Sequence, residues 1–230
     1  MGILFSAWLI MMIGNNNADL VAELLPQDVA FDAFDSVLET YVDSTGRVDY
    51  TSLRRGPSQL GKFLRFVKEV SPENRPDLFM NEDEKKAYWI NVYNALVIKA
   101  VVDHPGIAGV GEITWGKGIF WRRKFQAGGR KMTLYHIEHR ILRNRFRDPR
   151  IHFAISCASN SCPPLGNRMV TGADLDAQLE ERTARFIRNE SDVRVDHGRK
   201  EVRLSRIFKW YRKDFTANGE SLLEYVVRYL

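Results

Sequence analysis

Residues 82–102, with the sequence EDEKKAYWINVYNALVIKAVV, decide the fold of this 230-residue chain. Asn81 and Glu84 form an Asn-x-x-Glu pattern that starts a helix, and His104-Pro105-Gly106 ends it. Between these signals, apolar residues cover nearly every face of the helix: Ala87, Trp89, Ile90, Tyr93, Leu96, Val97, Ile98 and Val101. A helix that is apolar on all sides lies in a core. We therefore expect the other elements to pack around this segment.

Two polar side chains fall inside this apolar segment. Asn91 and Asn94 lie one turn apart on the expected helix. A buried amide without hydrogen-bond partners costs about 1–3 kcal/mol. We therefore expect each asparagine either to pin neighbouring backbone or to belong to a functional site. Trp89 and Tyr93 of the same helix join them as candidate site residues.

The periodicity of the rest of the chain predicts an α+β fold. Helical spacing of apolar residues predicts further helices at about residues 26–42, 57–70, 133–146, 171–189 and 221–230. Alternation around glycine turns predicts hairpins at 121–132 and 193–204. We expect helices around the central helix and a small, mostly antiparallel sheet, in one domain of residues 18–230.

The N-terminal residues 3–13, ILFSAWLIMMI, form an unbroken apolar run. The run is shorter than the roughly 17 residues that a membrane-spanning helix needs, but it has the length of the apolar part of a secretory signal. Residues 1–17 are therefore predicted to be an export signal or a membrane anchor, which places the protein in the periplasm or cell envelope. The alternatives are a buried helix in a cytoplasmic protein or a wrongly assigned start, because no Lys or Arg precedes the run and residues 15–18 make a poor cleavage site.

Positive charge is concentrated in residues 121–150. The net charge of the whole chain is +5. The ten cations of this segment are Arg122, Arg123, Lys124, Arg130, Lys131, Arg140, Arg143, Arg145, Arg147 and Arg150. If they form one surface, it attracts anions. The predicted partner is an envelope polymer, an anionic lipid or an acidic protein, and no sequence-specific nucleic acid is expected. The alternative is a face that serves only solubility.

Both cysteines lie in the stretch Arg150–Gly166, RIHFAISCASNSCPPLG. Ile151, Phe153 and Ile155 alternate with more polar or smaller residues, which predicts a half-buried strand. Cys157 and Cys162 follow among small and turn-forming residues, and two prolines prevent any regular continuation. The sulfurs are therefore expected in a loop at a strand end, where reactive groups are often displayed. A short disulfide between them is also compatible with the sequence.

A carboxylate and an imidazole precede this loop on the helix expected at 133–146. Glu138 falls in the middle of the apolar face of that helix, and His139 lies on the edge of the face. A carboxylate aimed into a core needs a cation or several hydrogen-bond donors. Glu138 is therefore either part of a structural ion pair or an orienting group in a site.

Five motifs resemble a known family. They are Gly46-x-Val48-Asp49-Tyr50, Tyr88-Trp89-Ile90-Asn91-Val92-Tyr93-Asn94-Ala95, Ile137-Glu138-His139-x-x-Leu142-Arg143, His152-Phe153-Ala154-x-Ser156-Cys157 and Phe208-Lys209-Trp210-Tyr211-x-x-Asp214-Phe215. In this order they resemble the bacterial and plant family known as domain of unknown function 547, over about residues 28–230. Plant members keep the positions of Glu138, His139 and Cys157 and have serine in place of Cys162. The resemblance thus points to Cys157 with His139 and Glu138.

These residues lead to the hypothesis of a thiol-dependent hydrolase or transferase that acts on an amide or thioester, remotely like papain-like or transglutaminase-like enzymes. Cys157 is the nucleophile, His139 the general base, and Glu138 or Asn91 the orienting group. A small molecule or a peptide would be the substrate. Further candidate binding residues are Asn94, Trp89, Tyr93, His152, Ser156, Cys162 and Arg143.

No cofactor and no metal are expected. His139, His152, Cys157 and Cys162 are possible zinc ligands by type, but the Cys-x4-Cys spacing is looser than the usual Cys-x2-Cys. The serine of plant members also argues against a metal that needs both sulfurs. The alternative to the enzyme is a non-catalytic module that binds a ligand or partner and carries a basic surface.

Overall fold

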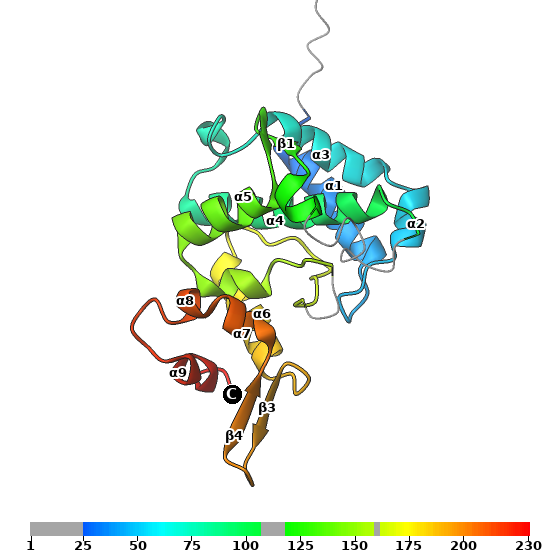
Figure 1. Ribbon diagram of the computed structural model, residues 1–230. Coiled ribbons are helices and arrows are strands. Elements are labelled where there is room, and N and C mark those ends of the chain that lie inside the picture. The colour runs from blue at the N-terminus through cyan, green and yellow to red at the C-terminus, as the bar shows by residue number, and fades with distance from the viewer. Residues whose placement is uncertain (1–24, 107–117, 159–161) are drawn as a thin grey trace, which may run out of the picture.

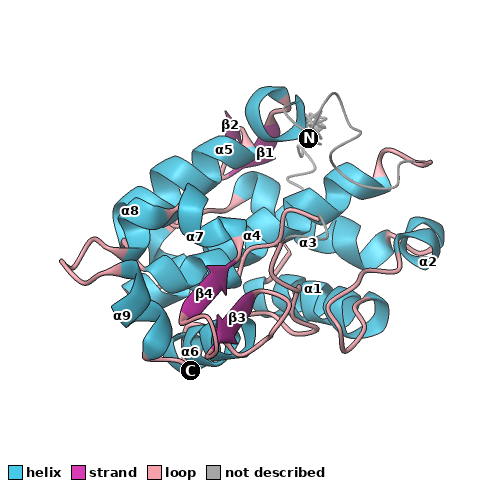
Figure 2. Cartoon of the chain, turned by 60° about the horizontal axis from the view of Figure 1, so that its bottom comes forward, coloured by secondary structure: helices cyan, strands magenta, loops and turns pink. Residues whose placement is uncertain are grey.

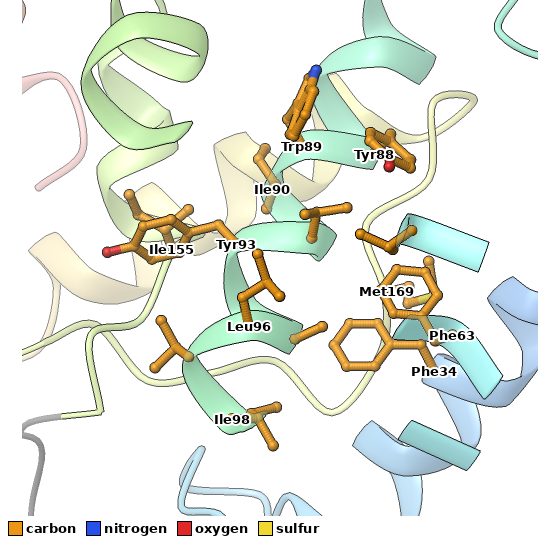
Figure 3. Packing of buried hydrophobic residues seen from close by; sticks show 14 of the residues in the cluster. Phe34, Phe63, Tyr88, Trp89, Ile90, Tyr93, Leu96, Ile98, Ile155 and Met169 are labelled. Atoms are coloured by element: carbon orange, nitrogen blue, oxygen red, sulfur yellow. The ribbon is translucent and has the colours of Figure 1, made fainter. Parts of the chain in front are cut away.

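The computed structural model describes residues 25–106, 118–158 and 162–230, and its central element is the helix α4 (Glu82–Val102). Both ends form where the sequence predicts them, and the Asn81 side chain accepts a hydrogen bond of 2.8 Å from the backbone N–H of Glu84. The helix is buried from Ala87 to Ile98. Figure 3 shows Tyr93 on one side of α4 and Phe34, Phe63 and Met169 on the opposite side. The helix therefore contacts the core in several directions.

Helices from the N-terminal third cover one side of α4. They are α1 (Gln27–Tyr41), α2 (Tyr50–Arg55), α3 (Ser58–Glu69) and the short 3-10 helix η1 (Pro76–Leu78). The rings of Phe34 on α1 and Phe63 on α3 stack with centroids 4.6 Å apart. The predictions of helices at 26–42 and 57–70 are confirmed.

The basic segment folds as a helical turn, a hairpin and a long helix. After the π-helical turn η3 (Gly118–Arg122), the strands β1 (Phe125–Ala127) and β2 (Arg130–Met132) pair antiparallel across Gly128-Gly129. Both glycines have positive φ, and their N–H groups donate to Val67 and Lys68 of α3. Thr133 then caps α5 (Leu134–His136), which continues as the π-helical η4 (Ile137–Phe146).

The prediction of a strand at Ile151–Ile155 is wrong, because these residues form the 3-10 helix η5 (Pro149–Phe153) and the turn after it. Asp148 caps η5 by accepting a hydrogen bond of 3.1 Å from the backbone N–H of Arg150, and Pro149 occupies the first helical position. Ile151, His152, Phe153 and Ala154 are all buried. The alternation in the sequence therefore does not mark one buried and one exposed face.

The C-terminal part builds a second group of buried aromatic residues. Its elements are α6 (Leu175–Ile187), β3 (Val193–Asp196), β4 (Glu201–Leu204), α7 (Arg206–Trp210), α8 (Arg212–Phe215) and α9 (Leu222–Val227). Figure 1 shows α6–α9 and the β3–β4 hairpin below α4. Phe153 of η5 belongs to this second core, together with Phe186, Phe208 and Phe215.

The fold is α+β, as the sequence predicts. Figure 2 shows how strongly helices outnumber the two small hairpins, and each hairpin is an antiparallel pair of strands. Within the described ranges, no helix is both long enough and apolar enough to cross a membrane. The predicted signal or anchor at 1–17 lies outside the described residues.

Candidate functional site

A cavity of about 360 Å³ lies beside the cysteine loop. Several residues that the sequence singled out lie at its wall, although they come from different elements: Tyr93, Glu138, His139, Arg143, His152, Cys157 and Cys162. Figure 3 shows Tyr93 of α4 beside Ile155, which lines the same cavity. The structure thus places a sulfur pair, two imidazoles and a buried carboxylate around one space.

Glu138 is buried and is held by two tyrosine hydroxyls rather than by a cation. Tyr211 donates to its Oε1 at 2.6 Å and Tyr93 donates to its Oε2 at 3.1 Å. Burial, followed by the negative charge of Glu138, raises the pKa of both tyrosines above the usual value, so both phenols stay protonated as donors. The carboxylate is therefore fixed from α4 on one side and from α7–α8 on the other.

His139 lies next to this carboxylate, and 28% of its side chain is exposed. Its Nδ1 is 3.7 Å from Oε1 of Glu138, and no described residue offers that nitrogen a hydrogen bond. The ring stacks on Tyr135 with centroids 4.0 Å apart, and Tyr135 stacks on Trp121 at 3.9 Å. Burial lowers the pKa of His139, and the charge of Glu138 opposes this shift. The imidazole is thus largely neutral near pH 7 and able to accept a proton.

A second imidazole, His152, lies deeper in the same wall, with 2% of its surface exposed. Its Nε2 is 2.7 Å from Oδ2 of Asp214 on α8. Arg143 holds the same carboxylate through two hydrogen bonds, of 2.6 and 3.0 Å. The guanidinium of Arg143 also lies over the ring of Tyr211, 4.9 Å from its centroid.

The two cysteines form a disulfide, with their Cα atoms 5.9 Å apart. Both sulfur-bearing residues line the cavity. The short bridge that the sequence allows is therefore present, and the thiol of Cys157 is not free in this structure. The hypothesis of an activated thiol concerns the reduced protein.

The predicted site residues Asn91, Asn94 and Ser156 do not line this cavity. Asn94 donates to the carbonyl of Ala154 and accepts from the N–H of Ser156, both at 2.9 Å. Asn91 bonds both backbone groups of Val170 and lines a different cavity of about 460 Å³. Both amides therefore pin backbone, as one of the two expectations had it, and Asn91 does not reach His139.

Trp89 also lies away from the cysteine cavity. Its indole N–H donates to Glu73 at 3.3 Å, and its ring is fully buried in the core. It lines a separate pocket with residues of the β1–β2 hairpin. Like Asn91, it is not brought together with Cys157.

The cations of residues 121–150 divide into two groups. Arg123, Arg143, Arg145 and Arg150 form ion pairs with described acidic residues. The other six are exposed and have no ion pair within the described ranges: Arg122, Lys124, Arg130, Lys131, Arg140 and Arg147. In the part of the chain that the structure describes, no group of three or more His, Cys, Asp or Glu side chains could hold a metal ion.

Several residues of the site were not predicted as such. Trp121 and Trp210 line the cavity with 56% and 57% of their surfaces exposed, and Tyr135, Tyr211 and Asp214 partner the predicted residues. The sequence held one signal for three of these five, since Trp210, Tyr211 and Asp214 belong to the last of the five family-like motifs. The aromatic spacing alone does not separate wall residues from core residues.

Comparison with known proteins gives one match. No curated protein and no solved structure matches the chain. The family model described as "Protein of unknown function, DUF547" matches residues 78–187, a narrower range than the five motifs cover. The matched residues hold α4, both imidazoles and both cysteines, whereas Tyr211 and Asp214 lie beyond them. Over residues 78–187 the chain is thus similar to the DUF547 family, which supports the resemblance seen in the motifs.

Proposed function

We propose that the protein is a thiol-dependent hydrolase or transferase that acts on an amide or thioester, with Cys157 as nucleophile and His139 as general base. The observation that carries this proposal is the shared cavity wall of Cys157, His139 and Glu138. A nucleophile, a base and an orienting group around one space are what covalent acyl transfer needs. A cavity of about 360 Å³ has room for a small molecule or a peptide side chain.

The first half of the reaction would form an acyl group on the sulfur. In the reduced protein, His139 takes the proton of the Cys157 thiol. Glu138, 3.7 Å away, stabilises the imidazolium that results. The thiolate attacks the carbonyl carbon, and the bond from that carbon to nitrogen or sulfur breaks. The leaving group takes the proton from His139, and a thioester remains on Cys157.

The disulfide makes this chemistry depend on the redox state. While Cys157 is bonded to Cys162, neither sulfur is a thiolate, so the oxidised protein has no nucleophile in the cavity. A dithiol reductant supplies the two electrons and two protons that convert the disulfide to two thiols. Activity is therefore expected only after reduction.

An activated ester tests the proposal without knowledge of the natural substrate. Treat the full chain with p-nitrophenyl acetate and follow the release of nitrophenolate and the mass of the protein. The wild type should gain one acetyl group on Cys157 after treatment with dithiothreitol and none before it. Cys162→Ser, which cannot form the disulfide, should be acetylated with or without reductant. Cys157→Ser should not be acetylated, and preferential acetylation of Cys162 would contradict the proposal.

The role of His139 is tested in the same assay. His139→Ala should slow acetylation of Cys157 by about 10²-fold or more, since general-base catalysis contributes that order of rate. His136→Ala is the matched control, because this exposed imidazole lies three residues earlier and not at the cavity wall. Equal rates for both variants would remove His139 from the mechanism.

The disulfide also favours a second candidate, a module that binds a ligand without chemistry. With both sulfurs bonded, the cavity is a pocket walled by aromatic rings, and Trp121 and Trp210 are exposed beside it. The binding module is favoured over the enzyme if the reduced wild type and reduced Cys162→Ser both fail to be acetylated.

A further inference from the structure

Two imidazoles line the cavity, each paired with a carboxylate, and the proposed function uses one of these pairs. His139 and Glu138 form a loose pair with 3.7 Å between nitrogen and oxygen. His152 and Asp214 form a tight pair at 2.7 Å. Both imidazoles line the cavity that the cysteines also line. The tighter pair has no role in the formation of the acyl group described above.

The surroundings of His152 determine which of its nitrogens can accept a proton. Burial tends to raise the pKa of Asp214, but hydrogen bonds from His152 and Arg143 outweigh it and hold this pKa below the usual value. Asp214 is thus a carboxylate, which can only accept, so Nε2 of His152 is the protonated nitrogen. Burial lowers the pKa of His152, so the ring is neutral near pH 7. Its lone pair is therefore on Nδ1.

The ring of His152 is also held in one orientation. It stacks on Tyr211 with centroids 3.8 Å apart, and Phe215 lies 5.5 Å away. Arg143 fixes Asp214 from η4, and only 2% of the His152 surface is exposed. An imidazole with an ionised carboxylate on one nitrogen and a fixed ring is suited to take a proton on the other nitrogen. The carboxylate then stabilises the imidazolium.

We propose that His152 is a second general base of the cavity, which takes the proton of the water or other acceptor that attacks the acyl group on Cys157. The proposal rests on the proposed function. The O–H proton passes to Nδ1 of His152 and the oxygen attacks the thioester carbon. The bond from that carbon to sulfur breaks, its electron pair returns to Cys157, and the proton on His152 passes to the thiolate. Asp214 and Arg143 are positioning residues.

The two halves of the reaction separate this role from that of His139. Reduce the full-length wild type and His152→Gln, and measure the initial burst and the steady-state rate with p-nitrophenyl acetate. His152→Gln should keep the burst but turn over about 10²-fold more slowly, so that acetylated Cys157 accumulates in the mass spectrum. Hydroxylamine needs no general base and should restore turnover. The rescue identifies the accumulated species as a thioester, and the unchanged burst separates this role from a merely structural one, because a disturbed cavity would slow the first half as well.

Two further variants keep the test decisive. Asp214→Asn leaves the ring of His152 in place and should slow the second half in the same direction. It therefore replaces His152→Gln if that variant does not fold. His104→Gln is the control, because this imidazole contacts Ala100 and Arg123 at the end of α4 and should leave the rate unchanged. The inference is overturned if both cavity variants deacetylate like the wild type, or if hydroxylamine does not restore turnover. A reduced wild type that shows neither turnover through Cys157 nor acetylation of Cys157 overturns the proposed function itself.

Discussion

The carboxylate of Asp148 lies at the start of η5, with 10% of its side chain exposed. Arg150 donates to it from Nε and Nη2 at 3.0 Å, and Lys86 of α4 lies 3.2 Å away. Burial tends to raise the pKa of Asp148, but the hydrogen bonds and charge of Arg150 outweigh it and lower this pKa. The unfolded chain therefore binds a proton at a higher pH than the folded protein does.

A pH dependence of stability follows for this residue. The contribution of Asp148 is fully present above the unfolded pKa of about 3.9 and is lost as the pH falls through the lower folded value. Asp148→Asn should lower the free energy of unfolding at pH 7 by about 1.5–3 kcal/mol. The variant should also lose less of its free energy of unfolding than the wild type does when the pH is lowered. Urea unfolding at several pH values measures both effects. Asp176→Asn removes an exposed partner of Arg150 and should change stability by at most about 1 kcal/mol.

For single residues, the sequence shows which buried polar groups need hydrogen-bond partners. It does not show which side chains those partners are. Glu138 was expected in a core because its helical position is surrounded by apolar residues, and it is buried. Its partners Tyr93 and Tyr211 come from segments far away along the chain. The same holds for His152 and Asp214, since no local pattern shows which distant side chains meet.

At the scale of elements, α4 carries two asparagines whose side chains form hydrogen bonds to the backbone of two different segments. Asn94 holds the backbone from Ala154 to Ser156, directly before Cys157, whereas Asn91 holds Val170. Each amide makes one donated and one accepted hydrogen bond to backbone. The two asparagines therefore make the same kind of contact, but Asn94 does so near the cysteine cavity and Asn91 does so away from it.

Replacing the two asparagines should separate stability from reactivity. Asn94→Ala and Asn91→Ala should both destabilise the protein, by about 1–3 kcal/mol for each backbone group left without a partner. Only Asn94→Ala should also slow acetylation of reduced Cys157, because it releases the segment that carries the sulfur. Urea unfolding and the burst assay measure the two effects. Equal slowing by Asn91→Ala would show that the effect is general loosening.

The accuracy of the predicted elements depends on whether local signals agree. Helix 82–102 was predicted to the residue because an asparagine cap, a continuous apolar surface and a His-Pro-Gly stop coincide. The strand at 151–155 was not formed, because the Asp148-Pro149 start signal favours a helical turn and the segment is buried on all sides. Ile151 faces the core around α4 while Phe153 faces the aromatic core of the C-terminal part. Alternation between two cores resembles alternation between core and solvent.

For the whole molecule, the distribution of charge bears on the partner. Four of the ten cations in residues 121–150 are neutralised in ion pairs, which leaves the six exposed ones named above to attract anions. Net charge along the sequence could not reveal this division, because it depends on acidic residues from α4, α6 and α8.

Binding to anionic vesicles should depend on the exposed cations. We expect the full chain to bind phosphatidylserine vesicles at low ionic strength and to lose this binding steeply as salt is added. Arg130→Glu with Lys131→Glu should weaken binding, whereas Lys209→Glu with Lys213→Glu, an equal change of charge outside the segment, should have less effect. Vesicle co-sedimentation measures this, and binding that does not respond to salt would rule out the electrostatic surface.

The order in which the ribosome delivers the chain has a consequence for the disulfide. Cys157 and Cys162 are made together, only five positions apart, whereas Tyr211 and Asp214 are made later. On a nascent chain, the two sulfurs are therefore present before Glu138 and His152 have their C-terminal partners. Oxidation at that stage needs only the local loop, so the bond can close before the cavity exists. Where an oxidant closes the bond at that stage, its later reduction takes place in a cavity that has assembled around it.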